Sequence, residues 1–152
     1  MTTTEDALLP AVHGLLKTAS WPASAENPTG VTVLFGAYRP LANTELVAVT
    51  GLTNTTIESR EEVITFDVAT LINIPGYNEL RTWERRVELT NALIETLIGD
   101  FTLPATVRAT GVYWWHIVAR QTSVEPAADV VPGSSGWVGY ALLTIEAKAH
   151  PC

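Results

Sequence analysis

The chain has 152 residues, a formal net charge of −7 and a pI of about 4.8. Its length fits one domain spanning residues 1–152, and its acidic surface repels phosphate, which argues against binding to a nucleic-acid backbone. Charged residues make up 16% of the chain, against about 25% in typical soluble domains, while 47% are hydrophobic. Two explanations stay open: other subunits cover part of the surface, or the core is enlarged.

The sequence also bears on the compartment. The single cysteine, Cys152, excludes an intramolecular disulfide and fits a reducing environment. The polar, acidic stretch Met1–Asp6 lacks the basic and apolar regions of a secretory signal. No apolar run approaches the roughly 18 residues of a membrane span. We therefore expect a soluble protein, made in the cytoplasm, with no membrane partner.

The first predicted element is a helix over about residues 5–18. Thr3 and Thr4 offer hydroxyl caps, acidic residues follow in the first turn, and apolar side chains then recur at three- and four-residue spacing. Pro10 lacks an N–H donor, so either it lies close enough to the first turn to be tolerated or the helix begins later.

Strands are expected next, at residues 31–38, 45–50 and 62–73. The threonine-rich stretch 51–60 between the last two is typical of either a further edge strand or a loop. The strand over 62–73 alternates like a half-buried strand, with one side formed by Ile64, Phe66, Val68 and Ile72 and the other by Thr65, Asp67 and Ala69.

The pattern then changes to a helical period over residues 78–98. One apolar face is expected from the side chains that recur at three- and four-residue spacing: Leu80, Trp83, Val87, Ile94, Leu97 and Ile98. The helix is expected to end at Gly99, in the left-handed conformation that glycine adopts just past a helix C-terminus.

Two further strands are predicted at residues 106–120 and 137–149, joined by a long loop over 121–136. The order α-β-β-β-α-β-β indicates an α+β fold, with a mainly antiparallel sheet and two helices packed on one face. Two helices cannot cover both faces of five strands, so the other face meets either water or a neighbouring subunit.

Residue types that carry chemistry are present but scattered. The three histidines, His13, His116 and His150, do not have metal-ligand spacing, and the Gly-Ser-Ser-Gly run at 133–136 fits a hairpin loop better than a phosphate loop. Asp67 is more simply a solvated or subunit-bridging carboxylate than a general base. The pairs Arg81/Glu84 and Arg85/Glu88 read as ordinary exposed-face pairs of a helix. We therefore expect no catalytic residue, no cofactor and no metal.

The adjacent tryptophans Trp114 and Trp115 are the least usual local feature. Neighbouring strand residues point to opposite faces, so one indole is expected beneath the helix and the other on the opposite side. With Trp137 on the facing strand, they predict an aromatic cluster suited to an interface; a two-sided core closed by the chain itself is the open alternative. The candidate interface residues are Tyr113, Trp114, Trp115, Trp137, Asp67 and Glu61.

Several short motifs follow one another along the chain. They are V-x-V-L-x-G at Val31–Gly36, E-L-V-x-V at Glu45–Val49, R-E-E-x-x-x-F-x-V at Arg60–Val68, R-x-x-E-R-R at Arg81–Arg86 and L-x-x-D-x-T-L at Leu97–Leu103. In their order and spacing the chain resembles the tail terminator (minor tail) proteins of long-tailed bacteriophages, especially those of actinobacterial hosts. It departs from that family at Pro104-Ala105, where family members commonly have glycines.

The resemblance implies a structural virion protein rather than an enzyme. Such proteins form a hexameric ring that caps the tail tube, ends its polymerisation and joins the tail to the neck or stopper protein. The expected location is the tail–neck region of the virion, after assembly in the host cytoplasm. Loops over 121–136 and 51–61 would suit contacts with tube and neck. DNA would pass through the lumen without specific binding, and acidic residues there would keep it from sticking; lysines in their place should slow DNA ejection, and an unchanged rate would count against this.

Two other readings of the sequence remain. Within the virion, the chain could be another head–tail connector or a tail tube subunit of similar architecture. Outside it, the chain could be a small α+β enzyme or ligand-binding domain with a pocket between sheet and helix. The second reading requires Asp67, His116 and Tyr140 to face one another.

Overall fold

The α+β class is confirmed by the computed structural model, which describes residues 4–25, 27, 30–36, 44–99, 103–130 and 132–150, without the side chains of residue 5 and residues 51–53. The helices in this part of the chain are α1 (Thr4–Thr18), α2 (Glu79–Ile98), α3 (Ala105–Arg108) and α4 (Ala127–Val130). The strands are β1 (Thr32–Phe35), β2 (Thr44–Glu58), β3 (Glu61–Asn73), β4 (Val112–Pro126) and β5 (Trp137–Ala149). None of these helices is long and apolar enough to cross a membrane.

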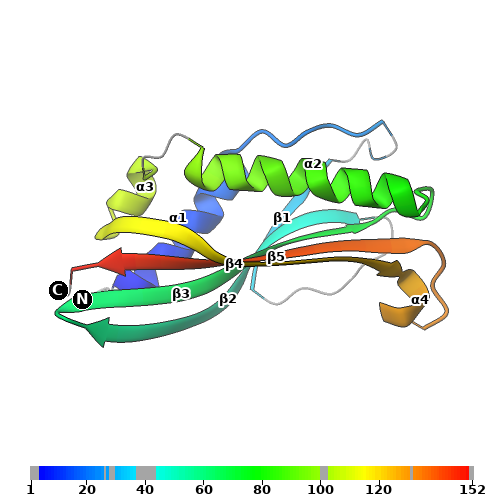
Figure 1. Cartoon of the computed structure of the whole chain (residues 1–152). Helices are drawn as coiled ribbons and strands as arrows, with labels where there is room; N and C mark the ends of the chain where they lie inside the picture. The colour runs from blue at the N-terminus through cyan, green and yellow to red at the C-terminus, as the bar shows by residue number, and fades with distance from the viewer. Residues whose placement is uncertain are drawn as a thin grey trace.

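The strands form one twisted sheet in the order β1-β2-β3-β5-β4 (Figure 1). β1 pairs with β2 in parallel, and the other three pairings are antiparallel. Strand β4 therefore lies at one edge of the sheet and the short strand β1 at the other. The long strands β2, β3 and β5 lie between these two edges.

The main core lies between the sheet and helices α1 and α2, which pack on the same face. It contains apolar side chains of both helices and of alternate strand residues: Leu8, Leu9, Val12, Leu16, Val47, Val49, Ile64, Phe66, Val68, Leu93, Leu97, Leu143 and Ile145. We call this side the helical face. The second face carries a smaller apolar cluster near α4: Leu46, Ala48, Leu71, Ala127 and Val138. The alternation expected in β3 is thus observed, since Asp67 on the second face is only half-buried.

Helix α1 begins at Thr4 and contains Pro10 in its interior. The exposed ring of Pro10 points away from the core, and the helix continues for another eight residues, to Thr18. The missing proline N–H removes one helical hydrogen bond without ending the helix. The helix therefore does not begin later, which was one of the two expectations for this segment.

The threonine-rich stretch 51–60 belongs mostly to β2, which runs to Glu58. The turn to β3 consists of Ser59 and Arg60, whose φ angles are 47° and 67°. Positive φ at both central residues is the geometry of the two-residue turn that fits the twist of a hairpin. The segment is thus a long hairpin arm rather than the loop at 51–61 considered for tube or neck contacts.

The expected strand 106–120 and loop 121–136 are misplaced. Residues 105–108 form helix α3, the strand starts at Val112, and it continues to Pro126 before the short helix α4. The register of β4 shifts between Val112 and Trp114 and again between Ile117 and Ala119. At each bulge the alternation of side chains between the two faces shifts by one residue. A prediction that assumes a strict period of two therefore assigns the residues beyond a bulge to the wrong face.

The predicted apolar face of α2 is wrong in its first half. Leu80 and Trp83 are 63% and 50% exposed. The buried side chains are instead Thr82, Arg85, Arg86, Leu89, Thr90, Leu93 and Leu97. Gly99 also differs from the expectation, because its φ of −58° is right-handed helical.

Candidate interaction site

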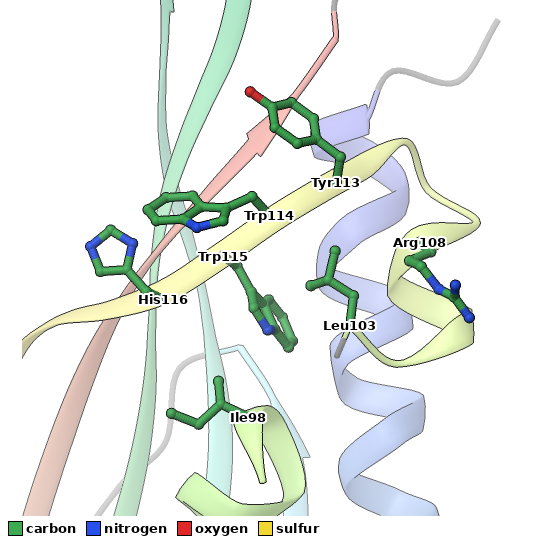
Figure 2. A pocket seen from close by; sticks show the side chains of 7 residues that line it. All are labelled: Ile98, Leu103, Arg108, Tyr113, Trp114, Trp115 and His116. Carbon is green, nitrogen blue, oxygen red and sulfur yellow. The ribbon is translucent and has the colours of Figure 1, made fainter. Parts of the chain in front are cut away.

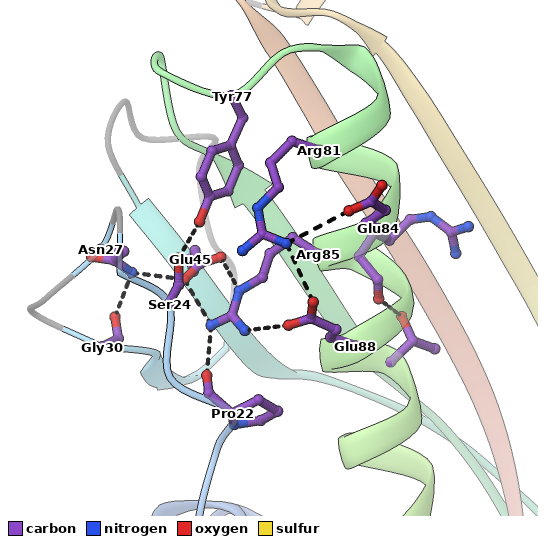
Figure 3. Close-up of polar contacts among 12 residues, drawn as sticks. Pro22, Ser24, Asn27, Gly30, Glu45, Tyr77, Arg81, Glu84, Arg85 and Glu88 are labelled. Carbon is purple, nitrogen blue, oxygen red and sulfur yellow. Dashed lines mark hydrogen bonds and ion pairs between the residues drawn. The ribbon is translucent and has the colours of Figure 1, made fainter.

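The rotation of α2 is set by a buried ion pair between Arg85 and Glu45 of β2 (Figure 3). Both side chains are fully buried, and the guanidinium donates from Nε to Glu45 Oε2 (2.6 Å) and from Nη2 to Glu45 Oε1 (3.0 Å). Its remaining donors bond to Glu88 Oε2 (2.9 Å) and to the carbonyl of Pro22 (2.7 Å). The expectation of an exposed Arg85/Glu88 pair is therefore wrong for Arg85.

Burial by itself lowers the pKa of Arg85, but the hydrogen bonds that it donates to Glu45 and Glu88, together with their negative charges, outweigh this effect, and the net pKa is raised. The carboxylate of Glu45 also accepts a hydrogen bond from Asn27 Nδ2 at 2.8 Å, and the hydroxyl groups of Ser24 and Tyr77 form a hydrogen bond nearby. The cluster thereby ties described residues of the connector after α1 to β2 and α2. Arg81 and Glu84 form the expected pair at 3.9 Å, but only Glu84 is exposed, and the half-buried Arg81 also donates to Glu88 Oε1 at 3.3 Å.

Fixing Arg85 against β2 turns the next residue, Arg86, toward β5, because successive helical residues are about 100° apart. The helix comes close to the strand at Gly139, where an added side chain would lie 3.0 Å from Thr82 Cγ2 and 3.4 Å from Arg86 Cβ. Arg86 is 6% exposed, and its Cζ lies 5.8 Å from the centre of the Trp83 ring. Its Nε and Nη1 have no hydrogen-bond partner among the described residues.

Beside Arg86, α2 and β4 enclose a shallow groove of about 260 Å³. It is lined by Glu79, Leu80, Trp83 and Val124, and we call it the α2–β4 groove. Arg120 of β4 lies close enough for its charge to act on Arg86. Both Arg120 and Val124 lie on the helical face of the sheet, since their partners in β5 are Leu143 and Gly139.

A second hollow, of about 610 Å³, lies at the other end of β4 (Figure 2). Its lining residues are Ile98, Leu103, Arg108, Tyr113, Trp114, Trp115 and His116. Trp115 points toward Ile98 and is buried against Phe66, with 6.4 Å between ring centres, whereas Trp114 and His116 lie on the other side of the strand. Of the two adjacent tryptophans, one therefore packs in the core and one lies on the second face, as expected.

The exposed aromatics of β4 have polar neighbours. Tyr113 (43% exposed) stacks on His150 at 4.6 Å, and Trp114 (37% exposed) contacts His116 at 4.1 Å. Lys148 Nζ lies 4.7 Å from the Trp114 ring centre. A hydrogen bond to Glu61, with smaller contributions from burial and the charge of Glu61, raises the pKa of Tyr113.

The predicted cluster of Trp137 with Trp114 and Trp115 is not formed. Trp137 pairs with Pro126, whereas Trp115 pairs with Ala147, ten residues further along β5. At about 3.3 Å per residue the two sites are roughly 33 Å apart. The half-buried Trp137 thus belongs to the end of the sheet that carries α4.

The residues required by the enzyme reading are not brought together. Asp67 Oδ1 accepts a hydrogen bond from Thr144 Oγ1 at 2.7 Å, and His116 pairs across β4 and β5 with Glu146. Tyr140 lies four residues from Thr144 on β5, which is about 13 Å. Among the described residues no group of three or more His, Cys, Asp or Glu side chains is placed to hold a metal ion.

Sequence reasoning missed Glu45, Arg86 and Arg120 as site residues. Glu45 had the appearance of a strand-end carboxylate, and its partner Arg85 is 40 residues away. The only sequence signal for Arg86 was the arginine pair on a helix whose N-terminal half also carries Leu80 and Trp83.

A comparison with protein-family models and with curated proteins finds no match for the chain.

Proposed function

We propose that this protein is a structural subunit that associates with copies of itself into a closed ring, and that the ring caps a bacteriophage tail tube and joins the tail to the neck. The self-association is supported by the surface of the subunit. The ring and its place in the virion follow from the resemblance of the sequence to tail terminator proteins. The residues described above are then used for contact rather than for catalysis.

The observation that carries the proposal is the free edge of β4. This strand is 15 residues long, and among the described strands β5 is its only neighbour in the sheet. Although two bulges interrupt its first half, residues 119–126 pair with β5 without a shift. A long edge with unpaired N–H and C=O groups is open to pairing with another chain unless something covers it.

Apolar side chains accompany this edge. Tyr113, Trp114 and Val118 are 43%, 37% and 44% exposed, and all three belong to β4. Aromatic residues of this kind are typical of the buried centre of protein interfaces. The low charge fraction of the chain is consistent with a subunit that covers such a surface by association.

The proposal is tested by deleting the gene in its phage and viewing the lysate by electron microscopy. Loss of a tail terminator should leave tubes of abnormal length and heads without tails, because nothing stops tube growth or offers a joint. A plasmid copy should restore virions. Normal virions after deletion would refute the proposed function.

Two matched variants connect the phenotype to the edge of β4. Val118→Lys places a charge on the exposed edge and should fail to restore virions, while the protein keeps its thermal stability. Val130→Lys, on α4 and 37% exposed, should restore them. Equal complementation by both variants would separate the function from this edge.

A further inference from the structure

The isolated subunit contains a buried cation that nothing in its described part neutralises. Four buried side-chain atoms in that part have no hydrogen-bond partner, and three of them are Thr82 Oγ1, Arg86 Nε and Arg86 Nη1. The neighbouring Arg85, which is fully buried, uses Nε, Nη1 and Nη2 in four hydrogen bonds. The two arginines thus differ in having a carboxylate within reach.

An unpaired guanidinium in this position works against the fold. Its desolvation is unfavourable, and removing water without supplying an anion is the costly case for a buried charge. Burial, and secondly the charge of Arg120, lowers the pKa of Arg86. An apolar side chain of similar length would be better tolerated in a solitary subunit. We therefore expect an anionic group of another molecule to pair with Arg86.

The residues around Arg86 indicate which kind of protein segment would carry that anionic group. Leu80, Trp83 and Val124 give the α2–β4 groove an apolar lining. The guanidinium of Arg86 lies against the Trp83 ring of this lining, and the charge of Arg120 acts on it as well. Glu79 is the one carboxylate in the lining, and Glu84 is exposed on the same helix. A ligand that fits would place an apolar side chain against Trp83 and a carboxylate against Arg86.

The tip of the β2–β3 hairpin offers this combination. Ile57 is 72% exposed, the highest value among the exposed large apolar side chains of the described residues. It pairs directly across the hairpin with Glu62, so both side chains point to the same face. The next pair places Glu58 opposite Glu61. Like charges in directly opposite positions are unfavourable, and a cation from another subunit would relieve them.

The groove and the hairpin tip lie at opposite ends of the subunit. Glu62 pairs with Ala149 at one end of β5, and Val124 pairs with Gly139 ten residues away, which is about 33 Å. Figure 1 shows the hairpin end of β2 and β3 on the left and the start of α2 on the right. One subunit cannot bring the two together, whereas successive subunits can do so in a head-to-tail contact.

We propose that the α2–β4 groove of one subunit binds the β2–β3 hairpin tip of the next, with Ile57 against Trp83 and the carboxylate of Glu62 paired with Arg86. This contact rests on the proposed ring function and adds two contacting surfaces to the free edge of β4. Because the surfaces differ, the contact is heterologous and repeats around a closed ring.

The first test replaces the cation by an apolar side chain of similar length. Arg86→Met should weaken association at least about thirtyfold in sedimentation velocity, as expected when one partner of a buried pair is removed. At a concentration where the wild type is monomeric, the same variant should unfold at a higher temperature. Arg81→Met is the control, because this half-buried arginine of the same helix is already paired with Glu84 and Glu88 of its own subunit, and it should leave association unchanged. Unchanged association of Arg86→Met, or a lowered unfolding temperature, would overturn the inference.

The second test uses the head-to-tail geometry. Ile57→Lys spoils the hairpin and keeps the groove, whereas Arg86→Met spoils the groove and keeps the hairpin. Each variant alone should be monomeric, and an equimolar mixture should form a one-to-one dimer that cannot grow. A mixture that stays monomeric overturns the inference. If both variants still form rings like those of the wild type, the proposed contact is wrong but the proposed ring stands. If the wild type is monomeric at every concentration, the proposed ring is wrong as well.

Discussion

The Arg85–Glu45 pair allows a direct test of how α2 is held. In Glu45→Gln the side chain keeps its size, but one of its two acceptors becomes an NH₂ group that cannot accept from the guanidinium. Arg85 is fully buried and would keep only Glu88, whose side chain is 43% exposed, as a charged partner. Removing one partner of a buried ion pair costs about 3–5 kcal/mol, and the remaining carboxylate places the expected loss at the lower end, about 3 kcal/mol.

The loss is measured by urea unfolding at neutral pH, followed by tryptophan fluorescence, at a protein concentration where the chain is monomeric. For a chain of this size, about 3 kcal/mol corresponds to a fall in Tm of roughly 6–12 °C. Glu88→Gln serves as the matched control and should cost at most about 1 kcal/mol, because that carboxylate is partly exposed. The double variant Glu45→Gln/Arg85→Met should be more stable than Glu45→Gln, since it leaves no buried charge. Equal effects of Glu45→Gln and Glu88→Gln would refute the reasoning.

Three further outcomes follow from single contacts. Replacing Ser59-Arg60 by Asn-Gly should stabilise the protein by about 1 kcal/mol in urea unfolding, because both residues have positive φ; an unchanged midpoint would contradict the turn geometry. Trp115→Ala should cost about 3–5 kcal/mol in thermal unfolding, because the indole is buried in the core; a loss below about 1 kcal/mol would place it at the surface instead. The pKa of Tyr113 is raised in the folded protein, so its share of stability is fully present below the unfolded pKa of about 10 and is lost as pH rises through the folded pKa. Glu61→Ala removes the acceptor and should lower that pKa in a spectrophotometric titration of the phenol, and an unchanged titration would exclude the hydrogen bond.

The strands and the main helix could be predicted because their patterns are local. In β3, Ile64, Phe66 and Val68 alternate with half-buried polar residues, and the core lies on the predicted side. In β5 the burial pattern alternates regularly over most of its length. A period of two decides such strands without knowledge of their neighbours.

The orientation of α2 could not be predicted because it depends on a distant residue. Judged by hydrophobicity, Leu80 and Trp83 belong inside and Arg85 outside. Glu45, which lies 40 residues earlier in the chain, reverses this by drawing Arg85 into the core. The exposure of Leu80 and Trp83 and the unpaired position of Arg86 are consequences of that one contact.

The position of Trp137 depended on register, which is a property of two strands together. Two bulges in β4 and a strand that extends to Pro126 place Trp137 far from Trp114 and Trp115. The bulge between Ile117 and Ala119 also puts Arg120 on the helical face. Neither bulge carries a glycine or proline at the shift that the sequence could have shown.

The central claim is that the subunit closes a ring with its own copies. Sedimentation velocity of the full chain over a wide concentration range, combined with negative-stain microscopy of the same samples, tests it most directly. The account predicts a single closed species of uniform diameter in equilibrium with monomer. A protein that remains monomeric at every concentration, or that grows into filaments of increasing length, would contradict it.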